Sequence, residues 1–160
     1  MDNFIKNYSE IQKTAIEFRW NGEKDDDKWN DENLEFRREI VESILRGDVI
    51  APDVLVRDLF EIEAVFCREA FGAGQTLADL GDLLLNQTGA RYIESYFAGK
   101  AQSFDTENTV IPYGVTKSKL ESIVEELNEL KVDGSRNEDL DYYISYLEAG
   151  LFHFQQIELR

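Results

Sequence analysis

The chain has 160 residues, 42% of them hydrophobic, and its 33 acidic side chains against 17 Lys and Arg produce a formal net charge of −16 at pH 7. A chain of this length can bury a core without a metal or a disulfide, which predicts one domain spanning residues 1–160. The charge argues against nucleic acid and anionic membranes as partners, because both are bound through basic surfaces. The first residues hold no continuous apolar run, and no stretch approaches the roughly 18 apolar residues of a membrane span. We therefore expect a soluble cytoplasmic protein.

The first third of the sequence predicts two helices separated by an acidic loop. Apolar residues between Phe4 and Phe18 recur at intervals of three and four, which indicates a helix over about residues 3–20. The next segment, GEKDDDKWND at 22–31, has no apolar periodicity and is expected to be a loop. A second helix is expected over about residues 32–46.

The longest helical pattern lies at residues 52–71, PDVLVRDLFEIEAVFCREAF. Leu55 and Leu59 lie on one apolar face, and a second apolar row beside it predicts a helix buried against neighbours on two sides. Cys67, the only cysteine, belongs to the second row and is expected to act as a small buried hydrophobe. Gly72 is the expected left-handed residue at the end of this helix.

The rest of the chain continues the helical pattern. Helices are expected at about 76–85, 90–99, 116–132 and from 135 onwards, with an irregular connection over 100–115. The last pattern favours a long terminal helix, and the alternative is a helix ending at Gly150 followed by a strand over 151–160. Together these patterns predict an all-α single-domain bundle of six or seven helices around the central buried helix at about 52–71.

No motif in the sequence indicates catalysis or a cofactor. His153 is the only histidine and lies more than 80 residues from Cys67, with no motif around either residue. The glycines at 72–74 lack the third glycine and the preceding strand of a dinucleotide-binding loop, and the acids at 25–27 lack the alternation of a calcium loop. We therefore expect no enzyme, no catalytic residue, no cofactor and no metal site.

Acidic residues gather in two stretches, and these are the predicted contacts with a partner. The first stretch surrounds a lone tryptophan and consists of Glu23, Asp25, Asp26, Asp27, Trp29, Asp31 and Glu32. The second lies on the outer face of the helix at 116–132 and in the following turn, and consists of Glu121, Glu125, Glu129 and Asp139. Aromatic side chains are enriched in interfaces, and acidic side chains attract basic partners. The alternatives are that Trp29 folds back onto the bundle and that the acids only solvate the surface.

In size, acidity, helical content and lack of catalytic residues, the chain resembles the immunity proteins that bacteria make against their own secreted nuclease toxins. The resemblance implies a tight one-to-one complex in the cytoplasm that occludes the cationic active site of a toxin. Negative charge would supply fast, salt-sensitive association, and aromatic anchors would supply slow dissociation. The alternative functions are an acidic chaperone or adaptor for an exported protein, a DNA-mimic inhibitor, and an enzyme that uses carboxylates and a metal.

Overall fold

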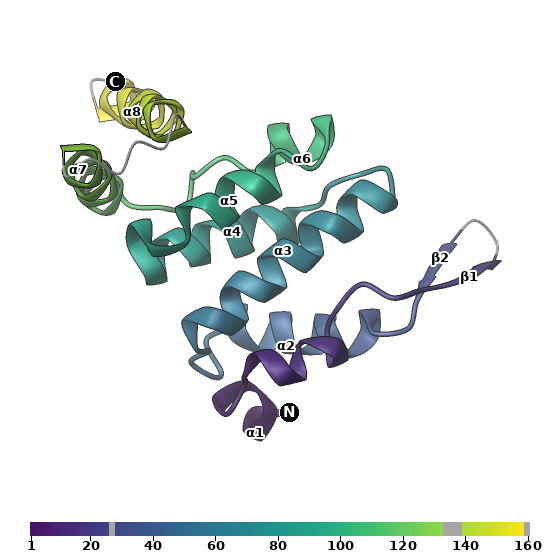
Figure 1. Cartoon of the computed structure of the whole chain (residues 1–160). Coiled ribbons are helices and arrows are strands. Elements are labelled where there is room, and N and C mark those ends of the chain that lie inside the picture. Colours follow the sequence, from purple (N-terminus) through teal and green to yellow (C-terminus); the bar gives the residue numbers. More distant parts are fainter. Residues whose placement is uncertain (26–27, 133–138, 159–160) are drawn as a thin grey trace.

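The computed structural model describes the backbone of residues 1–25, 28–132 and 139–158, and the side chains of these residues except at 21–25, 28–30, 132 and 152–158. The fold is all-α with one β-hairpin near the N-terminus (Figure 1). In chain order the elements are α1 (Asp2–Lys6), the 3₁₀ helix η1 (Glu10–Ala15), β1 (Trp20–Asp25), β2 (Lys28–Asp31), α2 (Leu34–Leu45), α3 (Asp53–Glu69), α4 (Gln75–Thr88), the 3₁₀ helix η2 (Gly89–Tyr92), α5 (Ile93–Lys100), α6 (Phe104–Thr109), α7 (Lys117–Val132) and α8 (Asp139–Glu158).

The predicted all-α class and the central helix are confirmed. Helix α3 packs against α4, α5 and α6, and Leu55, Leu59 and Phe60 are completely buried. Helix α5 approaches so closely that a Cβ atom at Gly99 would lie 2.4 Å from the Phe60 ring, so only glycine fits there without displacing the ring. Cys67 is buried as expected, and burial raises the pKa of its thiol to about 11.

The prediction of one helix over residues 3–20 is wrong. Helix α1 ends at Lys6, and a capping box between Ser9 and Gln12 starts η1 as a separate turn. The expected loop at 22–31 is also wrong in part, because β1 and β2 pair antiparallel with an irregular register, Trp20 opposite Asp31 and Lys24 opposite Trp29. Contacts with residues distant in the chain stabilise the base of the hairpin and favour this pairing. Apolar periodicity is a local pattern and does not reveal such contacts.

Two further differences concern the second half of the chain. The connection expected over 100–115 contains α6, which begins with a capping box between Ser103 and Thr106. The described residues therefore form eight α-helices, against the six or seven predicted. The long terminal helix is confirmed through Glu158, so the alternative of a strand after Gly150 is wrong.

Helices α7 and α8 lie side by side on one side of the molecule, opposite the hairpin (Figure 1). Helix α7 packs against η2, and α8 reaches α5 through a group of aromatic rings. The rings of Phe97 and Tyr143 stack with centroids 4.1 Å apart, and Tyr142 and Tyr146 meet Phe97 edge to face. These contacts fix the position of the α7–α8 pair relative to α5.

A partly buried carboxylate on α4, that of Asp82, holds the connection that leads into α7. Asp82 Oδ2 accepts a hydrogen bond from the Gly114 backbone N–H at 2.8 Å, whereas Asp82 Oδ1 is buried without a hydrogen-bond partner. Burial raises the pKa of Asp82 to about 6, and the bond from Gly114 only partly opposes this rise. The ionised carboxylate is therefore poorly accommodated in the folded protein.

We expect Asp82→Asn to stabilise the protein above the folded-state pKa. Because the folded pKa lies above that of an unfolded aspartate, folding favours the protonated form, and wild-type stability falls as the pH rises through about 6. Asparagine keeps an acceptor for Gly114 and carries no charge. Thermal unfolding should show a melting temperature several degrees above wild type at about pH 8 and close to wild type at about pH 4.5. A difference that does not depend on pH would contradict this account of Asp82.

Among the described residues, no helix combines the length and the apolar character that a membrane span needs.

Candidate functional site

The first predicted contact region lies on and around the β-hairpin. Glu23 and Asp25 belong to β1 and Trp29 to β2, where only the backbone is described, and Asp26 and Asp27 lie outside the described residues. Contacts of these five side chains with a partner stay a prediction. Glu32, just after β2, is exposed.

Asp31 differs from the other acids of this region because its carboxylate is engaged inside the protein. It is 6% exposed, and its Oδ2 accepts a hydrogen bond from Arg37 Nη2 at 2.7 Å. Its Oδ1 accepts hydrogen bonds from the backbone N–H groups of Arg19 and Asn33. The expectation that Asp31 is available to a partner is therefore corrected: this carboxylate fastens the base of the hairpin to α2.

The second predicted contact region is exposed. Glu121, Glu125 and Glu129 follow one another at four-residue spacing along α7, and Asp139 lies at the start of α8. Glu129 also lines a groove between α7 and η2. Of the three predicted acids on α7, Glu129 lines the groove, whereas Glu121 and Glu125 lie outside its lining.

The groove runs between the η2–α5 segment and the α7–α8 pair. It consists of two adjoining hollows of about 620 and 360 Å³ that share Ala90, Arg91 and Leu130. Leu130 is 47% exposed, whereas Ile93 and Leu140 contribute largely buried apolar surface. The remaining lining residues, mostly polar, are Thr88, Tyr92, Glu94, Ser95, Glu126 and Glu129.

Among the described residues, the lining of the groove carries more negative than positive charge. Arg91, its one cation in the described part of the chain, forms an ion pair with Asp53 at 3.0 Å and lies 5.1 Å from the centroid of the Tyr92 ring. Glu126 accepts a 3.3 Å hydrogen bond from the Ala90 backbone N–H and holds η2 to α7. Glu94 and Glu129 add two further exposed carboxylates. Because Asp53 neutralises Arg91 and these acids add negative charge, the groove favours binding of a positively charged group.

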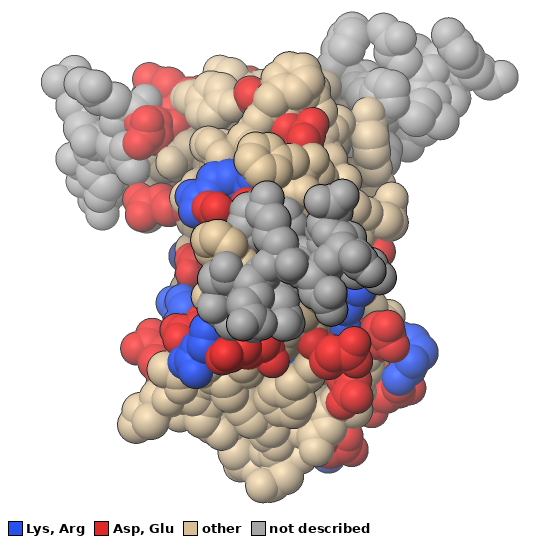
Figure 2. Space-filling view, turned by 90° about the vertical axis from the view of Figure 1, so that its right-hand side faces the viewer, with Lys and Arg blue, Asp and Glu red and all other residues tan. Residues whose placement is uncertain are grey.

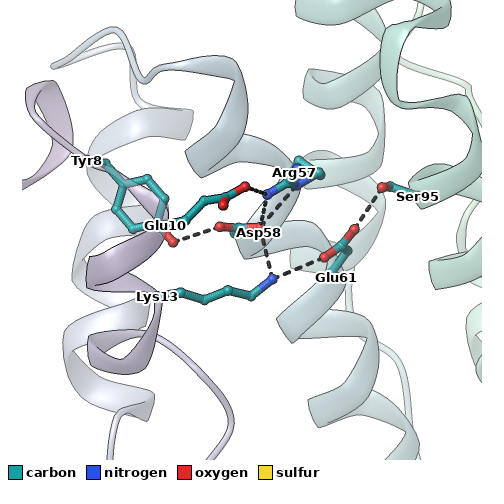
Figure 3. A network of polar contacts seen from close by, with 7 residues as sticks. All are labelled: Tyr8, Glu10, Lys13, Arg57, Asp58, Glu61 and Ser95. Carbon is teal, nitrogen blue, oxygen red and sulfur yellow. Dashed lines mark hydrogen bonds and ion pairs between the residues drawn. The ribbon is translucent and has the colours of Figure 1, made fainter.

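A polar network, not foreseen from the sequence, joins the N-terminal segment to α3 and α5 (Figure 3). Asp58 lies at its centre with a completely buried side chain that accepts hydrogen bonds from Tyr8 at 2.8 Å, Lys13 at 3.0 Å and Arg57 at 2.8 Å. Burial by itself raises the pKa of Asp58, but the bonds from Arg57, Tyr8 and Lys13 outweigh burial and hold the pKa below its ordinary value.

The same network extends to the groove. Lys13 also pairs with Glu61 at 3.4 Å, and Glu61 accepts a 2.7 Å hydrogen bond from Ser95, one of the groove residues. Each link is made within the protein, so the network serves to position η1, α3 and α5. The spacing of Asp58 from Leu55 and Ile62, two core positions three and four residues away, is the sequence signal that could have shown its burial.

No protein-family model, curated protein or solved structure matches the chain. In the described part of the chain, no group of three or more His, Cys, Asp or Glu side chains is arranged to hold a metal ion. The chemistry of the groove and the charge of the surface are therefore the observations on which a function can be based.

Proposed function

We propose that the protein binds a basic protein partner and, more specifically, that it neutralises a cationic nuclease-type toxin in a one-to-one complex. The observation that carries the proposal is the groove between α5 and α7, which joins exposed apolar surface at Leu130 to the carboxylates of Glu94 and Glu129. The net charge of −16 supports the same reading, because it attracts a basic protein from a distance.

The groove suits lysine and arginine side chains better than it suits small anions or purely apolar ligands. A lysine or arginine can lay its methylene stem along apolar surface while its charged end reaches a carboxylate. Leu130 offers such surface, and Glu129 lies one residue before it on the same helix. Because Arg91 is already paired with Asp53, it opposes an incoming cation only weakly.

Binding of this kind should depend strongly on ionic strength. Exposed charges are screened beyond about 8 Å at physiological salt, so the long-range attraction weakens as salt is added. Contacts between the partner and apolar groove surface are screened far less. We therefore expect salt to slow association more than it speeds dissociation.

The proposal is tested by charge reversal in the groove with a matched control. Glu129→Lys should weaken binding roughly tenfold, because it removes an attraction and adds a repulsion at the edge of the groove. Glu39→Lys changes the net charge equally on α2, where Glu39 is exposed and lies outside the groove. The tagged proteins are loaded with host-cell lysate, including cells that express toxins, and retained proteins are eluted with a salt gradient.

The expected result is that one basic protein is retained. It should elute from Glu129→Lys at a lower salt concentration than from wild type or Glu39→Lys. Adding the purified protein at equal molar amount should then suppress nuclease activity of that partner. Equal elution from both variants would count against the groove. A retained partner without any activity to suppress would count against the toxin-inhibitor form of the proposal.

A further inference from the structure

A hollow of about 270 Å³ lies between α2, α3 and the start of α4 and shares no lining residue with the groove. Its lining combines two almost completely buried charged side chains, Arg37 and Glu63, with the exposed cation Arg38. Val41 and Leu45 add apolar surface. Pockets for drug-sized ligands occupy roughly 300–1,000 Å³, so this hollow suits only a small molecule.

The hydrogen-bonding capacity of Arg37 and Glu63 is not used up inside the protein. Arg37 donates through Nη1 and Nη2 to Ile16 and Asp31, but its Nε is buried without a hydrogen-bond partner. Glu63 Oε2 lies 3.7 Å from this Nε, which is too long for a hydrogen bond. In the described part of the chain, Arg37 is the only cation within ion-pair distance of Glu63. Buried polar groups nearly always have a hydrogen-bond partner, so this donor and this acceptor indicate a ligand site.

The charges in the hollow favour a ligand that carries both signs. Arg37 and Asp31 neutralise each other, so Glu63 remains as a nearly buried negative charge. Burial raises the pKa of Glu63, although the charges of Arg37 and Arg38 oppose this rise. A ligand cation beside Glu63 would stabilise its ionised form. Arg38 is exposed and forms no ion pair with a described residue, so it can bind a ligand carboxylate.

The start of α4 completes the lining with Thr76. Helix α4 begins at Gln75 without a side-chain cap, so its first N–H groups and the positive end of its dipole lie beside Thr76 and favour a carboxylate. The turn before α4 begins with a hydrogen bond from the Gly72 N–H to the Cys67 carbonyl. Phe71, with φ 54°, takes the left-handed position expected for Gly72 in this turn. The turn leads into α4, which packs against α3.

The surrounding charge disfavours a ligand that is only negative. The chain has a net charge of −16, and acidic side chains predominate over basic ones on the face that carries the hairpin (Figure 2). Glu42, which also lines the hollow, is a further carboxylate and pairs with Arg46 at 3.8 Å. Arg38 and Glu63 are therefore the charges of the lining that a ligand can bind, and they call for one ligand charge of each sign.

We propose that this hollow binds a small aliphatic α-amino acid as a zwitterion. The ammonium group of the ligand donates to Glu63, and its carboxylate accepts from Arg37 Nε and pairs with Arg38. The adjacent ammonium and carboxylate of an α-amino acid match an acceptor and a donor that lie 3.7 Å apart. The aliphatic side chain packs against Val41 and Leu45. This site lies outside the groove and does not rest on the proposed binding of a basic protein.

The test follows the amide NMR chemical shifts of the full chain during titration with L-leucine, isoamylamine and isocaproate. Isoamylamine is leucine without its carboxylate, and isocaproate is leucine without its ammonium group. Leucine should bind at least about tenfold more tightly than either analogue, because each analogue leaves one charged group of the hollow without a partner. The shifts on leucine binding should centre on Val41, Glu63 and Thr76 and should spare Leu130 in the groove.

Three variants assign the two charges. Glu63→Gln should weaken binding of leucine and isoamylamine at least about tenfold, because it removes the charge that pairs with the ammonium group. Arg38→Gln should weaken binding of leucine several-fold and leave that of isoamylamine unchanged, because the amine has no carboxylate. Glu39→Gln is the control, because it makes the same charge change as Glu63→Gln at an exposed position of α2 outside the hollow. Arg38 is exposed, so Arg38→Gln tests the site independently of any loss of stability in Glu63→Gln.

Two results would overturn the proposal. Isocaproate that binds as tightly as leucine would show that Glu63 does not attract the ligand. Leucine that gives no saturable shifts at about 10 mM, or gives shifts centred on the groove, would show that the hollow is not its site. Either result would leave the proposed function open, because the groove is tested with a basic protein and with Glu129→Lys.

Discussion

Arg37→Leu is expected to lower the free energy of unfolding by about 3–5 kcal/mol, the usual cost of removing one partner from a buried ion pair. The Arg37 side chain is 1% exposed, donates to Asp31 at 2.7 Å and to the Ile16 carbonyl at 3.2 Å, and lies 3.7 Å from Glu63. Leucine fills part of the volume of the Arg37 side chain but leaves the carboxylates of Asp31 and Glu63 buried without this cation. Burial already raises the pKa of Glu63 against the opposing charge of Arg37, so that carboxylate is the one expected to take up a proton in the variant.

The loss should appear in urea unfolding followed by circular dichroism. Arg46→Leu is the matched control, because Arg46 is exposed at the end of α2 and pairs with the exposed acids Glu42 and Asp48, so its replacement should change stability by less than about 0.5 kcal/mol. Adding Asp31→Asn to Arg37→Leu should recover part of the loss, since asparagine keeps an acceptor for the backbone N–H groups of Arg19 and Asn33 without a buried charge. A loss below about 1 kcal/mol in Arg37→Leu would mean that the ion pair does not hold the hairpin base.

Asp58→Ala has the second large expected effect, again about 3–5 kcal/mol. The replacement removes the acceptor shared by Tyr8, Lys13 and Arg57 and leaves the Tyr8 hydroxyl without its partner (Figure 3). Because this acceptor ties the segment before β1 to α3, we expect the N-terminal residues to lose protection from amide hydrogen exchange before the rest of the protein.

The effect of Asp58 should depend on pH in a defined direction. The folded-state pKa of Asp58 is lowered, so its stabilising effect is present above the ordinary carboxyl pKa of about 4 and is lost as the pH falls through the folded-state value. The difference in stability between wild type and Asp58→Ala should therefore be largest near neutral pH and should shrink in acid. Glu39→Ala, at an exposed position on α2, serves as the control and should show no such trend. A constant difference across this range would indicate that packing, and not the charge of Asp58, is responsible.

Both predictions concern residues that position the surfaces proposed to bind a partner. Arg37 and Asp31 fasten the base of the hairpin, whose strands carry Glu23, Asp25 and Trp29. Asp58 and its network reach Ser95 at the groove through Lys13 and Glu61. Loss of partner binding in either variant therefore has to be compared with its loss of stability before a direct contact is inferred.

The sequence by itself determined the helical class, the central helix and the burial of Cys67, because apolar periodicity is a local property of the chain. It also showed where acids concentrate along α7. The spacing from Leu140 to Leu151 continues across Gly150 and therefore predicts the long terminal helix that the structure has.

Only the tertiary structure decided which acids face inwards and where the concave surface lies. Asp31 and Asp58 look like surface acids in the sequence, yet Arg37 lies 6 residues from Asp31 in the chain, and Tyr8 lies 50 residues from Asp58. The groove depends on how the α7–α8 pair is set against η2 and α5 by Phe97 and Tyr143, and the left-handed Phe71 takes the place expected for glycine. The burial of these acids and the groove arise from contacts between distant segments, which local periodicity cannot encode.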